Sequence, residues 1–313
     1  MSVSEYPVIM DAAKLFTEEI HSCPLCGSAE ISAYESVLHH KVRVTYRICR
    51  GCGLVYQSPR IPETKMPEFY ESQYRLLYLG QAAPREQELE VQRRRAQNLV
   101  DFLDTNKWIP THHLDIGCGS GALLHATQSH FNCKVAGIEL DEAHRAYATE
   151  NGLKVYDSLE NWQLSETGLA DLVSMSHVLE HLAYPVEYLI RIRETVLSRE
   201  GRLLIEVPNL YFHSALEIAH TYAFSLTTLR NVLHKAGFEL IRYKLHSVPR
   251  PRLCPLYIAV IARPDQDAMQ HSFRPDRYSR QRRKLGRRLV SIEAAIRRRS
   301  RRALMKLHEQ MRG

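Results

Sequence analysis

Residues 114–121, Leu-Asp-Ile-Gly-Cys-Gly-Ser-Gly, constrain this chain more than any other feature. The six residues from Thr111 to Ile116 are typical of a short buried strand, and the run that starts at Ala122 is typical of a helix. The glycines therefore lie at a strand-to-helix turn, where the helix N-terminus leaves backbone N–H groups unpaired. Because glycine has no Cβ and tolerates positive φ, the backbone here can approach a ligand closely. We interpret the segment as the pocket of a nucleoside-containing cofactor.

The spacing of the glycines distinguishes between two kinds of cofactor. A dinucleotide site has Gly-x-Gly-x-x-Gly and holds the pyrophosphate at the helix N-terminus. Here Gly117, Gly119 and Gly121 alternate with other residues and follow Asp115. An acid at this point would repel a diphosphate, whereas it suits a cationic amine such as the ammonium group of a methionine moiety. About 20 residues further on, a second predicted strand carries Glu139, which can accept hydrogen bonds from both ribose hydroxyls.

The series of motifs after this turn resembles class I S-adenosylmethionine-dependent methyltransferases over residues 110–265. The matching segments are the predicted third strand at 153–159, the fourth strand with a Leu-Glu-His signature at 171–181, the fifth strand at 201–209, and a terminal antiparallel hairpin at 238–246 and 255–263. That hairpin distinguishes the family from dinucleotide-binding domains. The resemblance implies an α/β fold with a Rossmann-like, seven-stranded class I methyltransferase sheet and S-adenosylmethionine as the cofactor.

The resemblance also implies which residues surround this cofactor. The glycine turn and the acid before it would hold the methionine part, Glu139 the ribose, and the turn after the third strand the adenine. The implied cofactor-binding residues are Asp115, Gly117, Gly119, Gly121, Glu139, Asp157, Ser158, Leu159, Ser176, His177 and Tyr70.

Four of the seven cysteines form two Cys-x-x-Cys pairs, Cys23 with Cys26 and Cys49 with Cys52, separated by 22 residues. This spacing is typical of a zinc ribbon, in which two turns supply four thiolates in a tetrahedron. Four thiolates fill the coordination shell of Zn²⁺, so the sequence predicts a structural zinc ion. A redox dithiol and unligated cysteines are the alternatives.

The ribbon and the tyrosine-rich segment at 67–78 resemble a subgroup of methyltransferases with an N-terminal Cys-Pro-x-Cys-Gly ribbon. Members of this subgroup methylate deoxysugar nucleotides, and others belong to surface glycan assembly. The resemblance implies that Tyr70 lies in a segment that closes over cofactor and acceptor, and packing on the catalytic domain is the alternative. The expected regions are the ribbon at 1–60, a linker with lid helices at 61–109, the methyltransferase domain at 110–265 and a basic amphipathic tail at 266–313.

Three histidines are candidates for a general base. Methyl transfer from a sulfonium is an in-line displacement, and a neutral hydroxyl acceptor also needs a base to take its proton. His177 and His181 follow the predicted fourth strand, at the sheet edge where open α/β folds bind ligands, and His220 precedes a predicted helix at 226–236. A neutral imidazole there could accept the proton. We expect His177 to line the cofactor and His181 and His220 to face the acceptor.

The sugar methyltransferases of the subgroup have Glu-His followed by an aromatic pair at the position of His220. This chain has Ala219 in place of the glutamate and Ala223 in place of one aromatic residue. The resemblance therefore carries over only two residues of this stretch, His220 and Tyr222. The expected catalytic residues are His220, His181 and Tyr222.

Residues 273–313 carry a net charge of +12, whereas the whole chain carries +7. The rest of the chain is thus mildly acidic, and the tail is a basic arm. Apolar residues recur in the tail at intervals of three and four: Leu285, Leu289, Ile292, Ile296, Leu304, Leu307 and Met311. They predict an amphipathic helix beyond Gly286. Such a helix could contact anionic lipid, a protein partner or nucleic acid, and the scarcity of aromatic residues favours the first two.

No stretch of the sequence has the length of an apolar membrane span, and the N-terminus lacks a secretory signal. We expect a cytoplasmic enzyme that makes peripheral contact with the inner face of the membrane. The expected reaction is methyl transfer from S-adenosylmethionine, favouring O-methylation, to a sugar nucleotide, glycan or other small hydroxylated acceptor in polysaccharide biosynthesis. An RNA methyltransferase and a non-catalytic cofactor-binding scaffold are the alternatives.

Overall fold

The computed structural model describes residues 13–39, 42–66, 69, 84–104, 108–166, 168–213 and 216–310, and for 301–310 it describes the backbone alone. Tyr70, one of the expected cofactor contacts, lies outside these residues. Within the described ranges, no helix is both long enough and apolar enough to span a membrane. Short 3-10 helices occur at η1 (Ala13–Leu15), η2 (Glu63–Lys65), η4 (Leu179–His181) and η5 (Gln266–Gln270).

A seven-stranded sheet forms the centre of the molecule. In spatial order its strands are β10 (Phe238–His246), β11 (Tyr257–Pro264), β8 (Leu197–Pro208), β7 (Ala170–Ser176), β4 (His112–Ile116), β5 (Lys134–Ile138) and β6 (Val155–Tyr156). The five strands from β8 to β6 are parallel, and β11 and β10 add to β8 as an antiparallel hairpin. This order confirms the predicted class I methyltransferase sheet, including its terminal hairpin.

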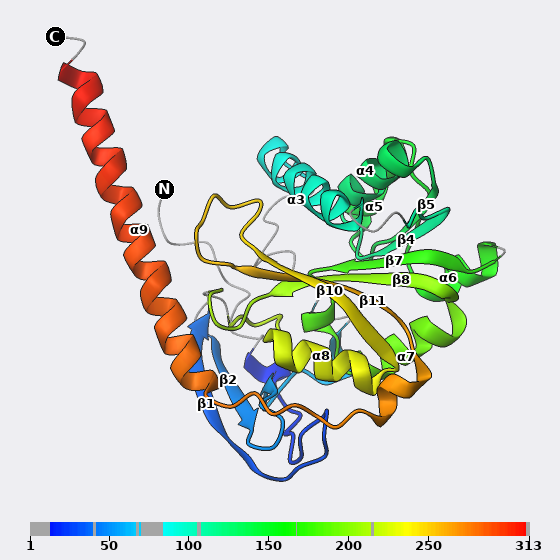
Figure 1. Ribbon diagram of the computed structural model, residues 1–313, viewed down its shortest axis with the longest axis horizontal. Coiled ribbons are helices and arrows are strands. Elements are labelled where there is room, and N and C mark those ends of the chain that lie inside the picture. The colour runs from blue at the N-terminus through cyan, green and yellow to red at the C-terminus, as the bar shows by residue number, and fades with distance from the viewer. Residues whose placement is uncertain are drawn as a thin grey trace.

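Helices cover both faces of this sheet (Figure 1). One layer contains α3 (Glu86–Asp104), α4 (Ala122–Phe131) and α5 (Glu142–Glu150), and the other contains α6 (Leu159–Ser165), α7 (Pro185–Thr195) and α8 (Leu226–Lys235). Successive residues of β8 point into opposite layers, so that Leu203 and Ile205 join the core with α7 and α8 while Leu204 joins the core with α3. A strand buried on both faces favours apolar residues at successive positions, which explains the apolar run from Leu203 to Ile205.

The cysteine-rich region forms a second, four-stranded antiparallel sheet. Its order is β1 (Ile31–His39), β2 (Val42–Cys49), β3 (Val55–Gln57) and β9 (Tyr222–Ala223). The last strand comes from the chain between β8 and α8, far from the cysteines in sequence. The part of the chain that forms the large sheet therefore also supplies one strand of the ribbon sheet.

The C-terminal helix α9 (Ser279–Gln310) begins before the expected position beyond Gly286. The prediction of a start beyond Gly286 is wrong, since this glycine lies within the helix, where α9 crosses close to Tyr211. A Cβ at Gly286 would lie 2.1 Å from the carbonyl oxygen of Tyr211. The far end of α9 projects away from the rest of the molecule (Figure 1). The expected apolar residues of its described part are exposed: Leu285 58%, Leu289 43%, Ile292 56% and Ile296 58%.

Two glycines that follow the cysteine pairs provide a test of how α9 is anchored. Gly53 has φ +84°, and a Cβ there would lie 2.7 Å from the carbonyl oxygen of Asp276, just before α9. Gly27 has φ +74° with no atom within 4 Å of such a Cβ. We expect Gly27→Ala to lower the free energy of unfolding by about 1–2 kcal/mol through backbone strain alone. Gly53→Ala should lower it further, because backbone atoms must also move apart.

Thermal unfolding of the zinc-loaded variants measures this difference. Equal midpoints for the two variants would contradict the close approach of Gly53 to the segment that leads into α9.

Candidate functional site

The turn between β4 and α4 is shaped by three glycines with positive φ. The φ angles are 72° at Gly117, 55° at Gly119 and 81° at Gly121. A Cβ at Gly117 would lie 2.5 Å from Val178, and one at Gly121 would lie 2.0 Å from Leu153. The first of these contacts shows that the chain following β7 lies directly against the glycine turn. Both segments therefore form one site at the carboxyl edge of the sheet.

Asp115 is the end of a chain of buried hydrogen bonds. Its Oδ1 accepts a 2.5 Å hydrogen bond from the hydroxyl of Ser174, whose strand β7 is paired with β4. The imidazole of His113 lies 2.6 Å from the Ser174 oxygen through Nε2 and 2.8 Å from the Thr127 hydroxyl through Nδ1. Burial lowers the pKa of His113 to about 3, so this ring is neutral. When Ser174 donates to Asp115, the Nε2–H of His113 donates to Ser174 and fixes the hydroxyl.

Burial also raises the pKa of Asp115 to about 7, against the opposing effect of the Ser174 hydrogen bond. The nearby carboxylate of Glu139 contributes to this rise by repulsion. Glu139 accepts backbone N–H bonds from Gly119 at 2.7 Å and from Asp141 at 2.8 Å, and burial raises its pKa as well. The two acids thus face the glycine turn from adjacent strands, and a cationic group between them would be stabilised.

The residues expected to flank the adenine separate in space. Ser158 is the N-cap of α6, where its hydroxyl accepts a hydrogen bond from the N–H of Asn161. Asp157 is exposed, and its carboxylate accepts bonds from the side chains of Ser158 and Asn161. Leu159 is buried in the main core next to Trp162. Of these three residues, Asp157 and Ser158 present polar side-chain atoms after the end of β6.

A carboxyl group and an imidazole of the segment after β7 meet a second imidazole from the chain just before β9. Glu180, His181 and His220 each offer a ligand atom, and these atoms lie within 4.8 Å of one another. Burial raises the pKa of Glu180 to about 8 and lowers the pKa of His181 to about 4, so both are mainly neutral at pH 7. The Nδ1–H of His181 donates to the carbonyl of Ala219 at 2.9 Å. This donor set could transfer protons or hold a metal ion.

Two of the expected residues, Ser176 and His177, contact a further buried acid, Glu206. The hydroxyl of Ser176 donates to Glu206 at 2.7 Å, and the Nε2 atom of His246 and the Nε atom of Arg95 lie 3.5 and 3.4 Å from its carboxylate. The backbone N–H of His177 donates to the Glu206 carbonyl at 2.9 Å. Sequence reasoning missed Glu206, although a single acid in the apolar run 203–207 is an available signal.

Further residues of the site were also missed. Glu180 stands inside the quoted Leu-Glu-His signature, so its carboxyl group could have been named. His113, Ser174 and Arg95 gave no such signal, because their roles arise from contacts between strands or with α3.

The ribbon sheet holds the segment that carries His220. The hydroxyl of Tyr46, a fully buried residue of β2, lies 2.9 Å from the carbonyl oxygen of Glu217 and 2.7 Å from that of His220. The side-chain amide of Gln57 also donates to the Glu217 carbonyl at 2.9 Å, and its backbone N–H donates to Thr221 at 2.9 Å. The position of the His220 backbone therefore depends on β2 and β3.

Tyr222 lies on the ribbon side of the site. Its hydroxyl donates to the Ala183 carbonyl at 2.9 Å and lies 3.2 Å from Nη1 of Arg60. With Glu180 and His220, Tyr222 also lines a cavity of about 10 Å³, which has room for one water molecule. A molecule larger than water can enter this cavity only when the lining residues move apart.

The four cysteines of the two pairs form a compact cluster whose sulfur atoms all lie within 4.8 Å. Cys23 and Cys52 have their sulfurs 3.6 Å apart, and those of Cys26 and Cys49 are 3.5 Å apart. A tetrahedron with zinc–sulfur bonds of about 2.3 Å has edges of about 3.8 Å. The cluster therefore has the composition and the dimensions of a four-thiolate zinc site.

A family model described as a methyltransferase domain matches residues 86–243, about half of the chain. The chain belongs to this methyltransferase-domain family. The match confirms the predicted enzyme class. It begins with α3, inside the expected linker of 61–109, and the contacts of α3 with the glycine turn and with Glu206 agree with a place in the domain.

Solved structures of the same fold accompany this match. One is an S-adenosylmethionine-dependent methyltransferase from Archaeoglobus fulgidus, with 20% identity, a TM-score of 0.45 and coverage of 54% of this chain and 92% of that one. Another is the 1,6-didemethyltoxoflavin-N1-methyltransferase of Burkholderia thailandensis with bound 1,6-didemethyltoxoflavin and S-adenosylhomocysteine, with 20% identity, a TM-score of 0.50 and coverage of 68% and 96%. At these identities the similarity shows the fold alone. A search of curated proteins found no match.

The buried Asp115 predicts a pH-dependent stability of the ligand-free protein. Its pKa is about 7 in the folded protein, against 3.8 for an ordinary aspartate. The free energy of unfolding therefore falls as the pH rises between these two values. Asp115→Asn keeps the acceptor for Ser174 but cannot ionise. We expect the variant to gain up to about 3 kcal/mol of stability relative to the wild type between pH 5 and pH 8.

Denaturant unfolding at several pH values measures this gain. Asp157→Asn is the matched control, because Asp157 is exposed and its pKa is lowered by the Asn161 side chain. A difference between Asp115→Asn and wild type that stays constant with pH would contradict the buried environment of Asp115.

Proposed function

We propose that the protein transfers a methyl group from S-adenosylmethionine to a hydroxyl group of a small acceptor, such as a sugar nucleotide or glycan. The observation that carries this proposal is the pair of imidazoles of His181 and His220, whose ring centres lie 4.9 Å apart beside Glu180. The segment of Glu180 packs on the glycine turn through Val178. A proton acceptor thus lies next to the proposed cofactor pocket, as methylation of a neutral hydroxyl requires.

The residues around the glycine turn fit this cofactor. When bound, S-adenosylmethionine supplies an electrophilic methyl group on a sulfonium. Asp115 would bind the amino group, oriented by Ser174, and Glu139 would accept the ribose hydroxyls in place of one of its backbone partners. Gly117 and Gly121 leave no room for a Cβ, so the turn holds its backbone close to the ligand. The fit of this cofactor depends on the glycine turn, which has no room for a Cβ, and on the buried carboxyl group of Asp115.

His220 is the better base of the two imidazoles. His181 already donates through Nδ1, and its lowered pKa makes it a weak proton acceptor. The Nε2 atom of His220 lies 3.9 Å from a carboxylate oxygen of Glu217, which would stabilise the imidazolium formed when the hydroxyl loses its proton. In this proposal His220 takes the proton, Glu217 stabilises the resulting charge, and His181 lines the acceptor pocket.

The zinc ion is proposed to be structural, bound by Cys23, Cys26, Cys49 and Cys52. It would hold together the sheet whose β2 and β3 position His220. The exposed apolar residues of α9 support contact of its outer half with an anionic membrane surface or a protein partner at the proposed cytoplasmic location. The described part of the tail presents few aromatic side chains for stacking on bases, which argues against nucleic acid.

Calorimetry and a radiolabelled methyl donor test the reaction. We expect the zinc-loaded protein to bind S-adenosylhomocysteine at micromolar concentration and to label the soluble or lipid-linked glycan pool of an extract. His220→Gln should lower turnover at least about a hundredfold without changing S-adenosylhomocysteine affinity, because a general base contributes roughly 10²–10⁴. His181→Gln is the comparison variant and should lose less.

Other outcomes would overturn parts of this proposal. Label in RNA would favour an RNA methyltransferase, binding without any label would favour a non-catalytic scaffold, and absence of binding would refute the cofactor. Full turnover by His220→Gln would show that another group is the base.

Tyr46 and Tyr56 form a matched pair for testing the role of the ribbon. Both are buried, but the Tyr46 hydroxyl bonds to the loop of His220 whereas that of Tyr56 has no hydrogen-bond partner among the described residues. Tyr46→Phe should lower kcat by about 10-fold or more, because misplacing a catalytic group costs about this much or more. Tyr56→Phe should leave kcat unchanged.

S-adenosylhomocysteine affinity should stay within about twofold in both variants, since neither tyrosine touches the glycine turn. Equal kcat values for the two variants would show that the ribbon does not position His220.

A further inference from the structure

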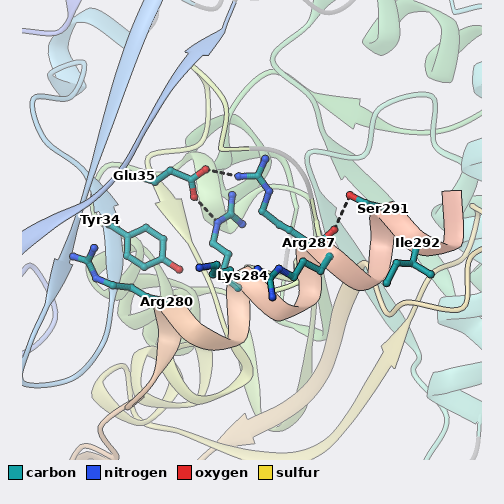
Figure 2. A pocket seen from close by; sticks show the side chains of 9 residues that line it. Tyr34, Glu35, Arg280, Lys284, Arg287, Ser291 and Ile292 are labelled. Atoms are coloured by element: carbon teal, nitrogen blue, oxygen red, sulfur yellow. Dashed lines mark hydrogen bonds and ion pairs between the residues drawn. The ribbon is translucent and has the colours of Figure 1, made fainter. Parts of the chain in front are cut away.

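A cleft of about 700 Å³ lies between α9 and the first strand of the ribbon (Figure 2). Its lining residues are Tyr34, Glu35, Arg280, Arg283, Lys284, Arg287, Arg288, Ser291 and Ile292. Five of these side chains are cationic, and Glu35 is the one acid among them. The cleft is outside the matched domain, so membership of the family says nothing about its ligand.

Glu35 is already used by two of the five cations. Its Oε2 lies 2.7 Å from Nε of Arg283. Its Oε1 lies 2.6 Å from Nη1 of Arg287, and Figure 2 draws this ion pair as a dashed line. Arg280 donates to the backbone carbonyl of Ala33 and has no carboxylate partner in the described ranges. The side chains of Lys284 and Arg288 make no hydrogen bond or ion pair with any residue that the structure describes. Three cations therefore share the cleft without an acid to balance them.

Arg283 shows that the cleft is a built site rather than a solvated charged surface. The residue is only 3% exposed, and its Nη1 donates to the carbonyl of Leu210 at 2.5 Å. Its Nη2 is buried and has no hydrogen-bond partner among the described residues. A buried, unpaired N–H of a charged group is unfavourable, and an anionic ligand could satisfy it.

Arg283 also connects the cleft to the proposed acceptor pocket. It lines the small cavity that Glu180, His220 and Tyr222 form, as well as the cleft itself. A molecule that reaches His220 with a hydroxyl group could therefore extend past Arg283 toward the cations of α9.

We propose that the cleft between α9 and β1 binds a phosphate or diphosphate group, and that this group belongs to the methyl acceptor. The second clause rests on the proposed function, whereas the first does not. Guanidinium groups match phosphate oxygens with two parallel hydrogen bonds, and a bound anion offsets the repulsion among the five cations. The volume of the cleft is within the range of about 300–1,000 Å³ that is usual for ligand pockets.

Binding of inorganic pyrophosphate to the full chain, measured by calorimetry, tests the site without cofactor or acceptor. The variant Lys284→Ser/Arg288→Ser removes two cations of the cleft that have no protein partner. The control Arg298→Ser/Arg299→Ser removes the same charge from exposed positions further along α9. We expect the first variant to weaken pyrophosphate binding at least about tenfold, because it removes charge-assisted hydrogen bonds to the anion, and the control to stay within about twofold.

Absence of binding at millimolar pyrophosphate would overturn the proposal. Equal weakening in the two variants would also overturn it, because it would show a general attraction to the charge of α9. Unfolding midpoints of both variants establish that they fold.

Two probes distinguish the sources of the phosphate. Competition of uridine diphosphate with pyrophosphate would identify a nucleotide-linked acceptor. Binding of the protein to phosphatidylcholine vesicles that contain a polyprenyl diphosphate would identify a lipid-linked acceptor. Either result supports the proposed site if the competition or the vesicle binding is lost in the Lys284→Ser/Arg288→Ser variant.

Failure of the site is distinguishable from failure of the proposed function. Pyrophosphate binding without S-adenosylhomocysteine binding would preserve the anion site and refute the methyl transfer. Once an acceptor is known, the cleft variant should raise its KM with little change in kcat, and an unchanged KM would refute the link to the acceptor.

Discussion

The buried hydroxyl of Tyr46 and the amide of Gln57 are the contacts on which the arrangement of the site depends. They bind backbone carbonyls of the loop at 217–221, and β9, which follows this loop, completes the ribbon sheet. The loop itself has few backbone partners within the large sheet. The carbonyl of His220 is buried and would be left unpaired without the Tyr46 hydroxyl, at a cost of about 1–3 kcal/mol. The ribbon thus holds in place the loop that carries His220, the proposed base.

Asp276 extends this dependence to the C-terminal helix. Its backbone N–H donates to the carbonyl of Cys52 at 3.1 Å, and its carboxylate accepts hydrogen bonds from the hydroxyls of Tyr211 and Ser225. Ser225 is also the N-cap of α8. One residue therefore joins the cysteine cluster, the methyltransferase domain and the start of α9. This connection explains why a tail that resembles a separate basic arm in sequence lies against β1 in space.

The features that sequence reasoning predicted correctly depend on local patterns. The glycine turn, the strands with their apolar runs and the clustering of two Cys-x-x-Cys pairs each follow from residues close together in the chain. The features that it missed depend on packing between distant segments. Ser174 faces Asp115 because β7 pairs with β4, Arg283 is buried because α9 begins early enough to cross Tyr211, and Arg95 reaches Glu206 because α3 covers the sheet. No pattern within any one segment encodes such pairings.

Four carboxyl groups gather at the carboxyl edge of the sheet: Asp115, Glu139, Glu180 and Glu206. Burial raises the pKa of each, so in the ligand-free site their ionised forms are destabilised. Arg95 is the cation that lies near Glu206. A ligand that brings positive charge would lower these pKa values and gain affinity in return. The proposed cofactor carries an ammonium and a sulfonium, whereas its demethylated product keeps only the ammonium. The same acids would therefore favour the methyl donor over the product, which assists exchange of one for the other after each turnover.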